Sequence, residues 1–170
     1  MIFNALKKKA LKKAVVQTQL AALNPDYNYT FSTVGVVLEK GEVIALEKMQ
    51  QSLQKIGVKL QNVDFLVYNA GASLKNVKAE SFSLSDFDNS GNTDKKEIRN
   101  FIEKPYDLLI SYYAKDAVPL LWVTSQSKAR FKVGISPVVS RVNHFTLEVT
   151  AMDAKQNIEN LIKYINNFKK

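Results

Sequence analysis

The residues with the clearest potential for chemistry lie in one acidic stretch, residues 86–97, which reads DFDNSGNTDKKE. Its oxygen-bearing side chains fall at the positions that a twelve-residue calcium loop uses, with Gly91 at the sharp turn. Hard oxygen donors on alternate residues can surround Ca²⁺, and a glutamate at the end of the loop can complete the shell. The predicted metal ligands are Asp86, Asp88, Ser90, Asn92, Asp94 and Glu97.

An ordinary solvated loop explains the same residues, because Asp, Asn, Ser and Gly are common in turns. The preceding residues, KAESFSLS, resemble a strand rather than the helix that enters a calcium loop, and the chain has no second loop of this kind. Thr93 stands where such loops usually have an apolar residue. In this reading, which we favour, Asp94 caps the following helix, and Ca²⁺ is a cofactor only in the alternative.

A second set of candidates follows from topology, because ligands of open α/β sheets bind outside the carboxyl ends of the strands. Polar or small residues follow four expected strands, and parallel strands would bring them to one edge. The predicted ligand-binding residues are Asn69, Asp86, Asp88, Tyr112, Tyr113, Asp116 and Arg141. Since every such fold has loops at this edge, plain connecting loops are the alternative to a small-molecule pocket.

Several other chemistries lack the residues that they need. The six glycines never occur as Gly-x-Gly and no Gly-Lys-Ser/Thr is present, so neither the dinucleotide fingerprint nor the phosphate-binding P-loop can form. The absence of cysteine excludes disulfides, thiolate metal sites and a cysteine nucleophile. His144 is the only histidine and is predicted to lie at the surface or beside a strand. We predict no catalytic residue.

The order of the expected elements predicts an α/β fold. Apolar runs at 33–38, 63–69, 106–112 and 131–135 alternate with helical patterns, which indicates a mostly parallel sheet with helices on both faces. The predicted architecture is a Rossmann-like three-layer sandwich. A last strand at 145–150 precedes a helix that Asp153 caps. The short segment 81–85 is expected to be an antiparallel or edge strand.

The first 25 residues contain five lysines and no acid, so they carry +5 of the net charge of +8. They predict a basic amphipathic helix that ends before Asn24-Pro25, joined to a single α/β domain over residues 26–170. The expected helix has Phe3, Leu6, Ala10 and Ala14 on one side and Lys8, Lys9 and Lys12 roughly opposite. A solvated surface is the simplest role for these lysines; weak contact with an acidic partner, RNA or an anionic membrane is the alternative.

Neither a membrane span nor a secretion signal is expected. The longest apolar run, Ala117–Val123, is far shorter than the roughly 20 residues that a spanning helix needs. The lysines near the start are interleaved with apolar residues, so no continuous apolar segment of a signal peptide follows them. We therefore expect a cytoplasmic protein.

The stretch YDLLISYYAKDAVPLLWVTSQSKARFKVGI, residues 106–135, resembles the core of a family of short uncharacterised proteins from Bacteroidota-type bacteria. The resemblance lies in Tyr106–Ile110 and Ser127–Gly134, and it implies a compact α/β fold without an assigned activity. The stretch is also similar to the N-terminal half of heptosyltransferase-like glycosyltransferases, although the chain has only one such half. We therefore predict a non-enzymatic binding or interaction module. The alternative is a small transferase-like domain that binds a nucleotide or sugar nucleotide at the strand carboxyl ends.

Overall fold

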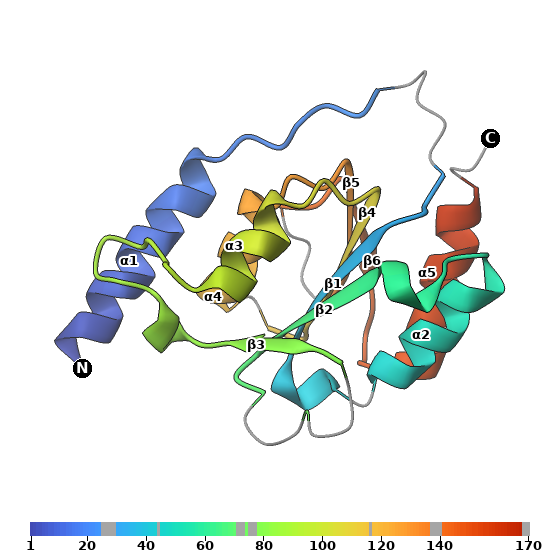
Figure 1. Ribbon diagram of the computed structural model, residues 1–170, viewed down its shortest axis with the longest axis horizontal. Helices are drawn as coiled ribbons and strands as arrows, with labels where there is room; N and C mark the ends of the chain where they lie inside the picture. Colours follow the sequence, from blue (N-terminus) through green and yellow to red (C-terminus); the bar gives the residue numbers. More distant parts are fainter. Residues whose placement is uncertain are drawn as a thin grey trace.

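The computed structural model describes residues 1–24, 30–43, 45–70, 74, 78–115, 117–136 and 141–167. Its centre is a six-stranded sheet in the order β3-β2-β1-β4-β5-β6, in which every neighbouring pair is parallel (Figure 1). The strands are β1 Val34–Glu39, β2 Val63–Tyr68, β3 Glu80–Phe82, β4 Leu108–Tyr112, β5 Phe131–Ser136 and β6 Phe145–Glu148. The predicted α/β class with a parallel sheet is confirmed. The short segment near 81–85 is an edge strand, and it is parallel rather than antiparallel to β2.

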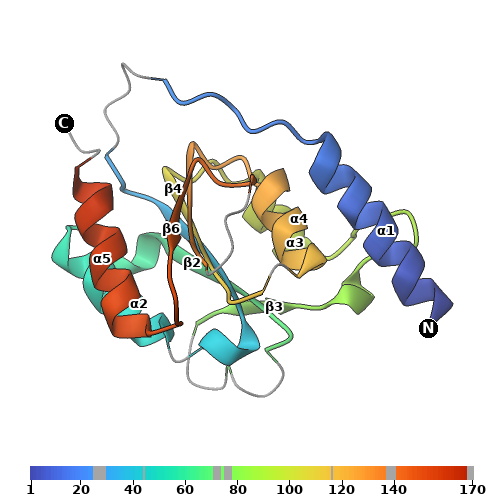
Figure 2. The same cartoon turned by 180° about the vertical axis from the view of Figure 1, so that it is seen from behind.

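Helices cover both faces of the sheet, as predicted. The described helices are α1 Ile2–Gln17, α2 Ala45–Lys55, α3 Lys96–Glu103, α4 Val118–Gln126 and α5 Ala154–Asn166. Figures 1 and 2 show α2 and α5 side by side on one face, α3 and α4 on the other, and α1 outside α4. Within the described part of the chain, no helix has the length and apolar character that crossing a bilayer requires.

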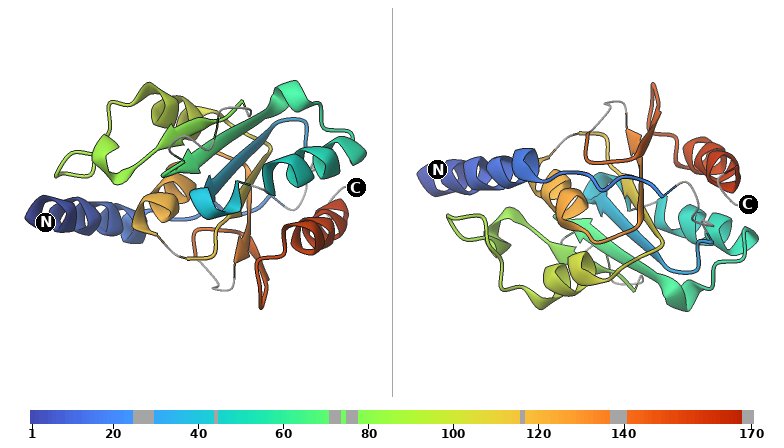
Figure 3. Two further views of the ribbon diagram at one scale, coloured as in Figure 1. Left: turned by 90° about the horizontal axis from the view of Figure 1, so that it is seen from below. Right: turned by 90° about the horizontal axis from the view of Figure 1, so that it is seen from above.

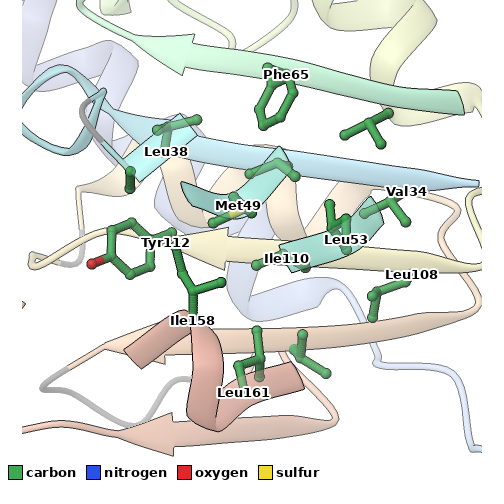
Figure 4. Close-up of a cluster of buried hydrophobic side chains, with 14 of the residues drawn as sticks. Val34, Leu38, Met49, Leu53, Phe65, Leu108, Ile110, Tyr112, Ile158 and Leu161 are labelled. Atoms are coloured by element: carbon green, nitrogen blue, oxygen red, sulfur yellow. The ribbon is translucent and has the colours of Figure 1, made fainter. Parts of the chain in front are cut away.

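The face under α2 and α5 holds the larger apolar core. Alternate residues of each strand point to one side, so Val34, Val36 and Leu38 of β1 all face these helices. They meet Met49 of α2 and Leu161 of α5, and each of these five side chains is fully buried (Figure 4). Because the central strands are covered on both faces, their sequences are continuously apolar rather than alternating.

The opposite face is filled by larger and more aromatic side chains. Phe87 meets Trp122 of α4 edge to face, with ring centroids 5.1 Å apart. Gly35 of β1 lies beneath the ring of Tyr106, where a side-chain Cβ would come within 2.9 Å of two ring carbons. A glycine at this strand position therefore gives the aromatic layer room to approach the sheet.

Of the two helix caps predicted from the sequence, one is confirmed and the other is wrong. Asp153 caps α5, its carboxylate accepting the backbone N–H of Gln156 at 3.0 Å. Asp94 does not cap α3, which begins at Lys96 without a side-chain cap. Thr93 explains the difference, because its hydroxyl accepts the N–H of Lys95 and donates to the carbonyl of Asp86.

The first helix is shorter than expected and packs differently. It ends at Gln17: Thr18 has an extended backbone, and both its N–H and its hydroxyl donate to the carbonyl of Ala14. Of the expected apolar side, Phe3 and Leu6 are 65% and 45% exposed, whereas Leu11 is completely buried. The second half of the helix lies on α4 and supplies the buried residue, while its first turns extend past the rest of the chain (Figure 3).

Candidate functional site

The strand order reverses between β1 and β4, so a crevice of the kind that binds ligands in open α/β sheets is expected at their carboxyl ends. There the side chain of Glu39, the last residue of β1, accepts the backbone N–H of Ala114 at 2.9 Å. Glu42 follows in the next turn, and burial together with the charge of Glu39 raises the pKa of its carboxyl. Two carboxylates thus stand where a phosphate-binding loop would offer backbone N–H groups.

Tyr112 ends β4 at this crevice and faces α2 and α5 (Figure 4). The side chain is fully buried, and its hydroxyl has no hydrogen-bond partner among the described residues. Burial, and to a smaller extent the charge of Glu42, raises the pKa of Tyr112 to about 12. The nearby amide of Asn157 donates to the carbonyl of Ala151 instead. Tyr112 is therefore a neutral hydroxyl at neutral pH, with hydrogen-bonding capacity unused by the described chain.

Tyr113 does not join Tyr112 in one pocket, because successive side chains of a strand point to opposite faces. Its hydroxyl lies 3.4 Å from that of Thr124 in α4, which in turn lies 3.0 Å from the hydroxyl of Ser111. The Thr124 hydroxyl also bonds the carbonyl of Leu120. This cluster of hydroxyl groups is buried between the sheet and α4 and ties the helix to β4.

The other residues predicted for the strand-end pocket lie apart or outside the described chain. Asn69 has a left-handed backbone (φ 55°) and donates its N–H to the carbonyl of Phe82, which closes the pairing of β2 with β3. Arg141 is exposed in the turn before β6. Asp116 lies outside the described residues. Of the set, the structure places Asn69 and Tyr112 at strand ends.

In the acidic loop, the side chains mostly bond the loop itself. Asp86 accepts the N–H of Ser83 at 2.7 Å and pairs with Lys95 at 3.2 Å. Asp88 accepts the N–H groups of Ser90 and Asn92 at 2.8 and 2.9 Å, and these hydrogen bonds lower the pKa of its carboxyl. Both carboxylates therefore have partners before any cation is considered.

The six predicted calcium ligands do not all line the same space. Asp86, Asp88, Asn92 and Asp94 line an open hollow of about 380 Å³ on the loop, whereas Glu97 lines a different cavity. Gly91 (φ 83°) turns the loop against α1, where a Cβ would come within 3.2 Å of Ala10. Among the described residues, no group of three acidic or histidine side chains is arranged to hold a metal ion.

The cavity that contains Glu97 was not predicted from the sequence. It has a volume of about 330 Å³ and lies between β2, the segment before β3, and α3. Its lining combines apolar and charged residues: Val63, Asp64, Phe65, Lys78, Ala79, Glu80, Glu97, Asn100, Phe101, Lys104 and Tyr106. The only sequence signal was Asp64, a charged residue inside an otherwise apolar strand.

Asp64 organises one wall of this cavity. Its carboxylate accepts the Tyr106 hydroxyl at 2.8 Å and pairs with the ammonium of Lys104, which also lies 5.1 Å above the Tyr106 ring. Burial and the hydrogen bond to Asp64 raise the pKa of Tyr106, so its phenol stays protonated. The three side chains come from β2 and from the segment between α3 and β4, and they hold each other in place.

The sheet edge forms another wall of the cavity. β3 pairs only with Leu66–Tyr68, so the Val63–Phe65 half of β2 has β1 on one side and the cavity on the other. Backbone groups alternate along a strand, and the N–H of Asn69 points toward β3; the groups that face the cavity are therefore those of Val63 and Phe65. The Val63 N–H bonds the carbonyl of Leu60. The Val63 carbonyl and the Phe65 N–H thus lie outside the pairing with β3, on the cavity side of β2.

His144 lies beside a strand, as predicted, and both of its ring nitrogens are engaged. Nδ1 accepts the backbone N–H of Lys132 at 2.9 Å, and Nε2 lies 2.7 Å from the carbonyl of Ala21. The ring is therefore the neutral tautomer with its proton on Nε2, and burial lowers the pKa of the imidazole. It joins the segment after α1 to the sheet.

One family model matches the sequence through all the strands and helices just described. It covers residues 4–168, nearly the whole chain. The chain belongs to DUF6913, a family of unknown function. No curated protein and no solved structure matches the chain. Membership in DUF6913 assigns no ligand, partner or reaction to the chain.

Proposed function

We propose that this DUF6913 chain is a cytoplasmic, non-enzymatic binding module that takes an extended peptide segment in the cavity beside β2. The observation that carries the proposal is the Val63–Phe65 half of β2, which lies outside the pairing with β3 and faces a cavity of about 330 Å³. A sheet edge pairs with groups that alternate donors and acceptors, and a peptide backbone is the ligand with that pattern. The absence of cysteine fits a reducing compartment.

The side chains of the cavity suit a peptide better than a single strongly charged ligand. Acids and lysines both line it, and Asp64 is already paired with Lys104. Phe101 and Tyr106, whose side chains lie on the α3 face of the sheet, form an apolar floor against which a side chain of the peptide can rest. The exposed amide of Asn100 offers a further donor and acceptor at the rim.

Binding of capped tripeptides of varied sequence, followed by amide chemical shifts of the full chain, tests the proposal. We expect shifts at β2 and α3 for a subset of the peptides. Asn100→Trp should abolish them by filling the cavity, and Arg99→Trp, an equally exposed change on the same helix that is outside the lining, should leave them intact. Binding that survives Asn100→Trp, or no binding by any peptide, would refute the proposal.

A second candidate function is a small transferase-like domain at the strand carboxyl ends. The reversal of strand order between β1 and β4, together with the Tyr112 hydroxyl, which has no hydrogen-bond partner among the described residues, favours a ligand there. The similarity of residues 106–135 to heptosyltransferase-like proteins points to a nucleotide or sugar nucleotide. Against it stand Glu39 and Glu42, whose negative charges would oppose a phosphate. Thermal shift and turnover assays with a panel of nucleotides and sugar nucleotides test this second candidate. Any turnover would favour the transferase-like domain over the non-enzymatic module.

A further inference from the structure

The first helix has two halves with different environments. In the second half, Leu11 is completely buried and packs on the α4 side of the core. In the first half, Ile2, Phe3 and Leu6 are 76%, 65% and 45% exposed. These three side chains, which we call the apolar tip, lie on turns that extend past the rest of the chain (Figures 1 and 3). An exposed cluster of this kind marks a contact surface more often than isolated apolar residues do.

The lysines of α1 surround and follow the apolar tip. They are Lys7, Lys8, Lys9, Lys12 and Lys13, and residues 1–25 contain no acid to balance them. None of the five forms an ion pair with a described residue. Ile2, Leu6, Lys9 and Lys13 are spaced three or four residues apart, so they share the outward side of the helix. The outward side thus presents apolar side chains first and positive charges next.

We infer that the apolar tip and the lysines of α1 dock the domain onto an anionic membrane surface. A bilayer interface accepts both parts: the tip enters the boundary between headgroups and acyl chains, and the lysines bind anionic headgroups. A nucleic acid would neutralise the lysines but would leave Ile2, Phe3 and Leu6 in water. A second copy meeting the same face would bring five lysines against five lysines. An anionic lipid surface is therefore the partner that fits both the apolar tip and the lysines.

The way α1 is attached explains why the contact would carry the whole domain. Gln126 at the end of α4 donates to the hydroxyl of Thr18 at 2.7 Å, and His144 bonds the carbonyl of Ala21. Leu11 adds a buried apolar contact between these bonds and the tip. The helix is fixed at its second half and presents its first half, so the domain would sit at the lipid surface in a defined orientation.

Vesicle flotation of the full chain tests this inference. We expect binding to phosphatidylcholine vesicles that contain about 30% phosphatidylserine, little binding to pure phosphatidylcholine, and release at about 0.5 M NaCl. Replacing the tip with Ile2→Ser, Phe3→Ser and Leu6→Ser should weaken binding about tenfold or more. Val16→Ser is the matched control, because Val16 is 77% exposed on the same helix but far from the tip. It should leave binding unchanged.

A second readout reports on insertion itself. Phe3→Trp places an exposed indole at the tip, whereas the native Trp122 is only 8% exposed. Its emission should shift to the blue on addition of the anionic vesicles and should not shift with phosphatidylcholine alone. Absence of binding to the anionic vesicles, binding that persists in the triple serine variant, or binding by a single-stranded RNA oligonucleotide in place of vesicles would overturn the inference. Because the replaced side chains are exposed, circular dichroism should show that every variant is folded.

Discussion

The two faces of the sheet are both buried, but they are filled by different kinds of side chain. Under α2 and α5, most of the buried residues are aliphatic; the aromatic ones are Phe31, Phe65, Tyr112 and Phe131. Under α3 and α4, aromatic rings share the space with buried polar groups: Ser111, Thr124, Ser125 and Lys132. Aliphatic packing is stabilising without being directional, whereas each buried polar group requires a partner in a defined place. The second face therefore fixes the position of α4 as well as burying it.

Two adjacent residues of the central strand β4 test whether both faces are packed equally tightly. Leu109 points to the α3 and α4 side and Ile110 to the α2 and α5 side, and neither has exposed surface. Leu109→Ala and Ile110→Ala should each lower the free energy of unfolding by roughly 2–5 kcal/mol, because each leaves a cavity. Urea denaturation measures both. Leu60→Ala, at a 42% exposed position, is the control, and an unchanged midpoint for either core variant would show that its face is loose.

The buried side chain of Lys132 distinguishes the α3 and α4 face most clearly from the α2 and α5 face. Its ammonium donates to the carbonyl of Ser125 at 3.1 Å, and burial lowers its pKa from 10.5 to about 8. The unfolded chain therefore holds more protons between these values, so the free energy of unfolding rises as the pH increases from about 8 to 10.5. Below pH 8 the Lys132 side chain is charged in both the folded and the unfolded chain, and burying this charge lowers the free energy of unfolding by roughly 3 kcal/mol.

Lys132→Met should remove this pH dependence and raise the free energy of unfolding at pH 7 by up to that amount. Urea denaturation at pH 7 and at pH 10 measures it in both proteins. Lys128→Met, at a side chain that is 60% exposed, controls for the loss of a charge. If Lys132→Met and the native chain differ in free energy of unfolding by the same amount at both pH values, the charged side chain of Lys132 is not buried.

His144, whose ring stacks on that of Phe131, should have a smaller effect on the free energy of unfolding. Its folded-state pKa lies below the ordinary 6.5 because burial disfavours the charged ring. As the pH falls below 6.5 the unfolded chain takes up the proton first, so the free energy of unfolding falls. Protonation of the ring in the folded state also breaks the bond from the Lys132 N–H to Nδ1. We expect a loss of about 1 kcal/mol between pH 7 and pH 5, which is absent in His144→Gln. Equal losses in both proteins would assign the pH dependence to other groups.

The smallest expected effect is that of Ca²⁺ on the melting temperature through the acidic loop, residues 86–97, beside the α3 and α4 face. Asp86 and Asp88 already accept hydrogen bonds from the loop, and Glu97 lines another cavity. Millimolar Ca²⁺ should therefore leave the melting temperature unchanged, in the native chain and in Glu97→Gln alike. A rise that disappears in Glu97→Gln would instead establish the six-residue calcium site predicted as the alternative.

Local patterns were enough to predict the elements and the fold class. Alternation of apolar runs with helical patterns predicted the parallel sheet, and Asp153 predicted the start of α5. These features depend on neighbours close in sequence. Helix α1 stops at Gln17, earlier than Pro25 alone indicated, and there Thr18 is held by Gln126, a residue distant in sequence, as well as by Ala14.

The sequence by itself determined that this chain forms a covered parallel sheet, because continuous apolar strands have no other stable place than between two layers of helices. Only the tertiary structure decided where polar groups meet. The length of β3 leaves Val63–Phe65 facing a cavity, and Asp64 joins Lys104 and Tyr106 across some 40 residues of chain. It also decided which side of α1 is buried, since Leu11 packs on α4 while Phe3 and Leu6 stay exposed. Periodicity describes the sides of a helix, but contact with the rest of the fold selects the one that leaves water.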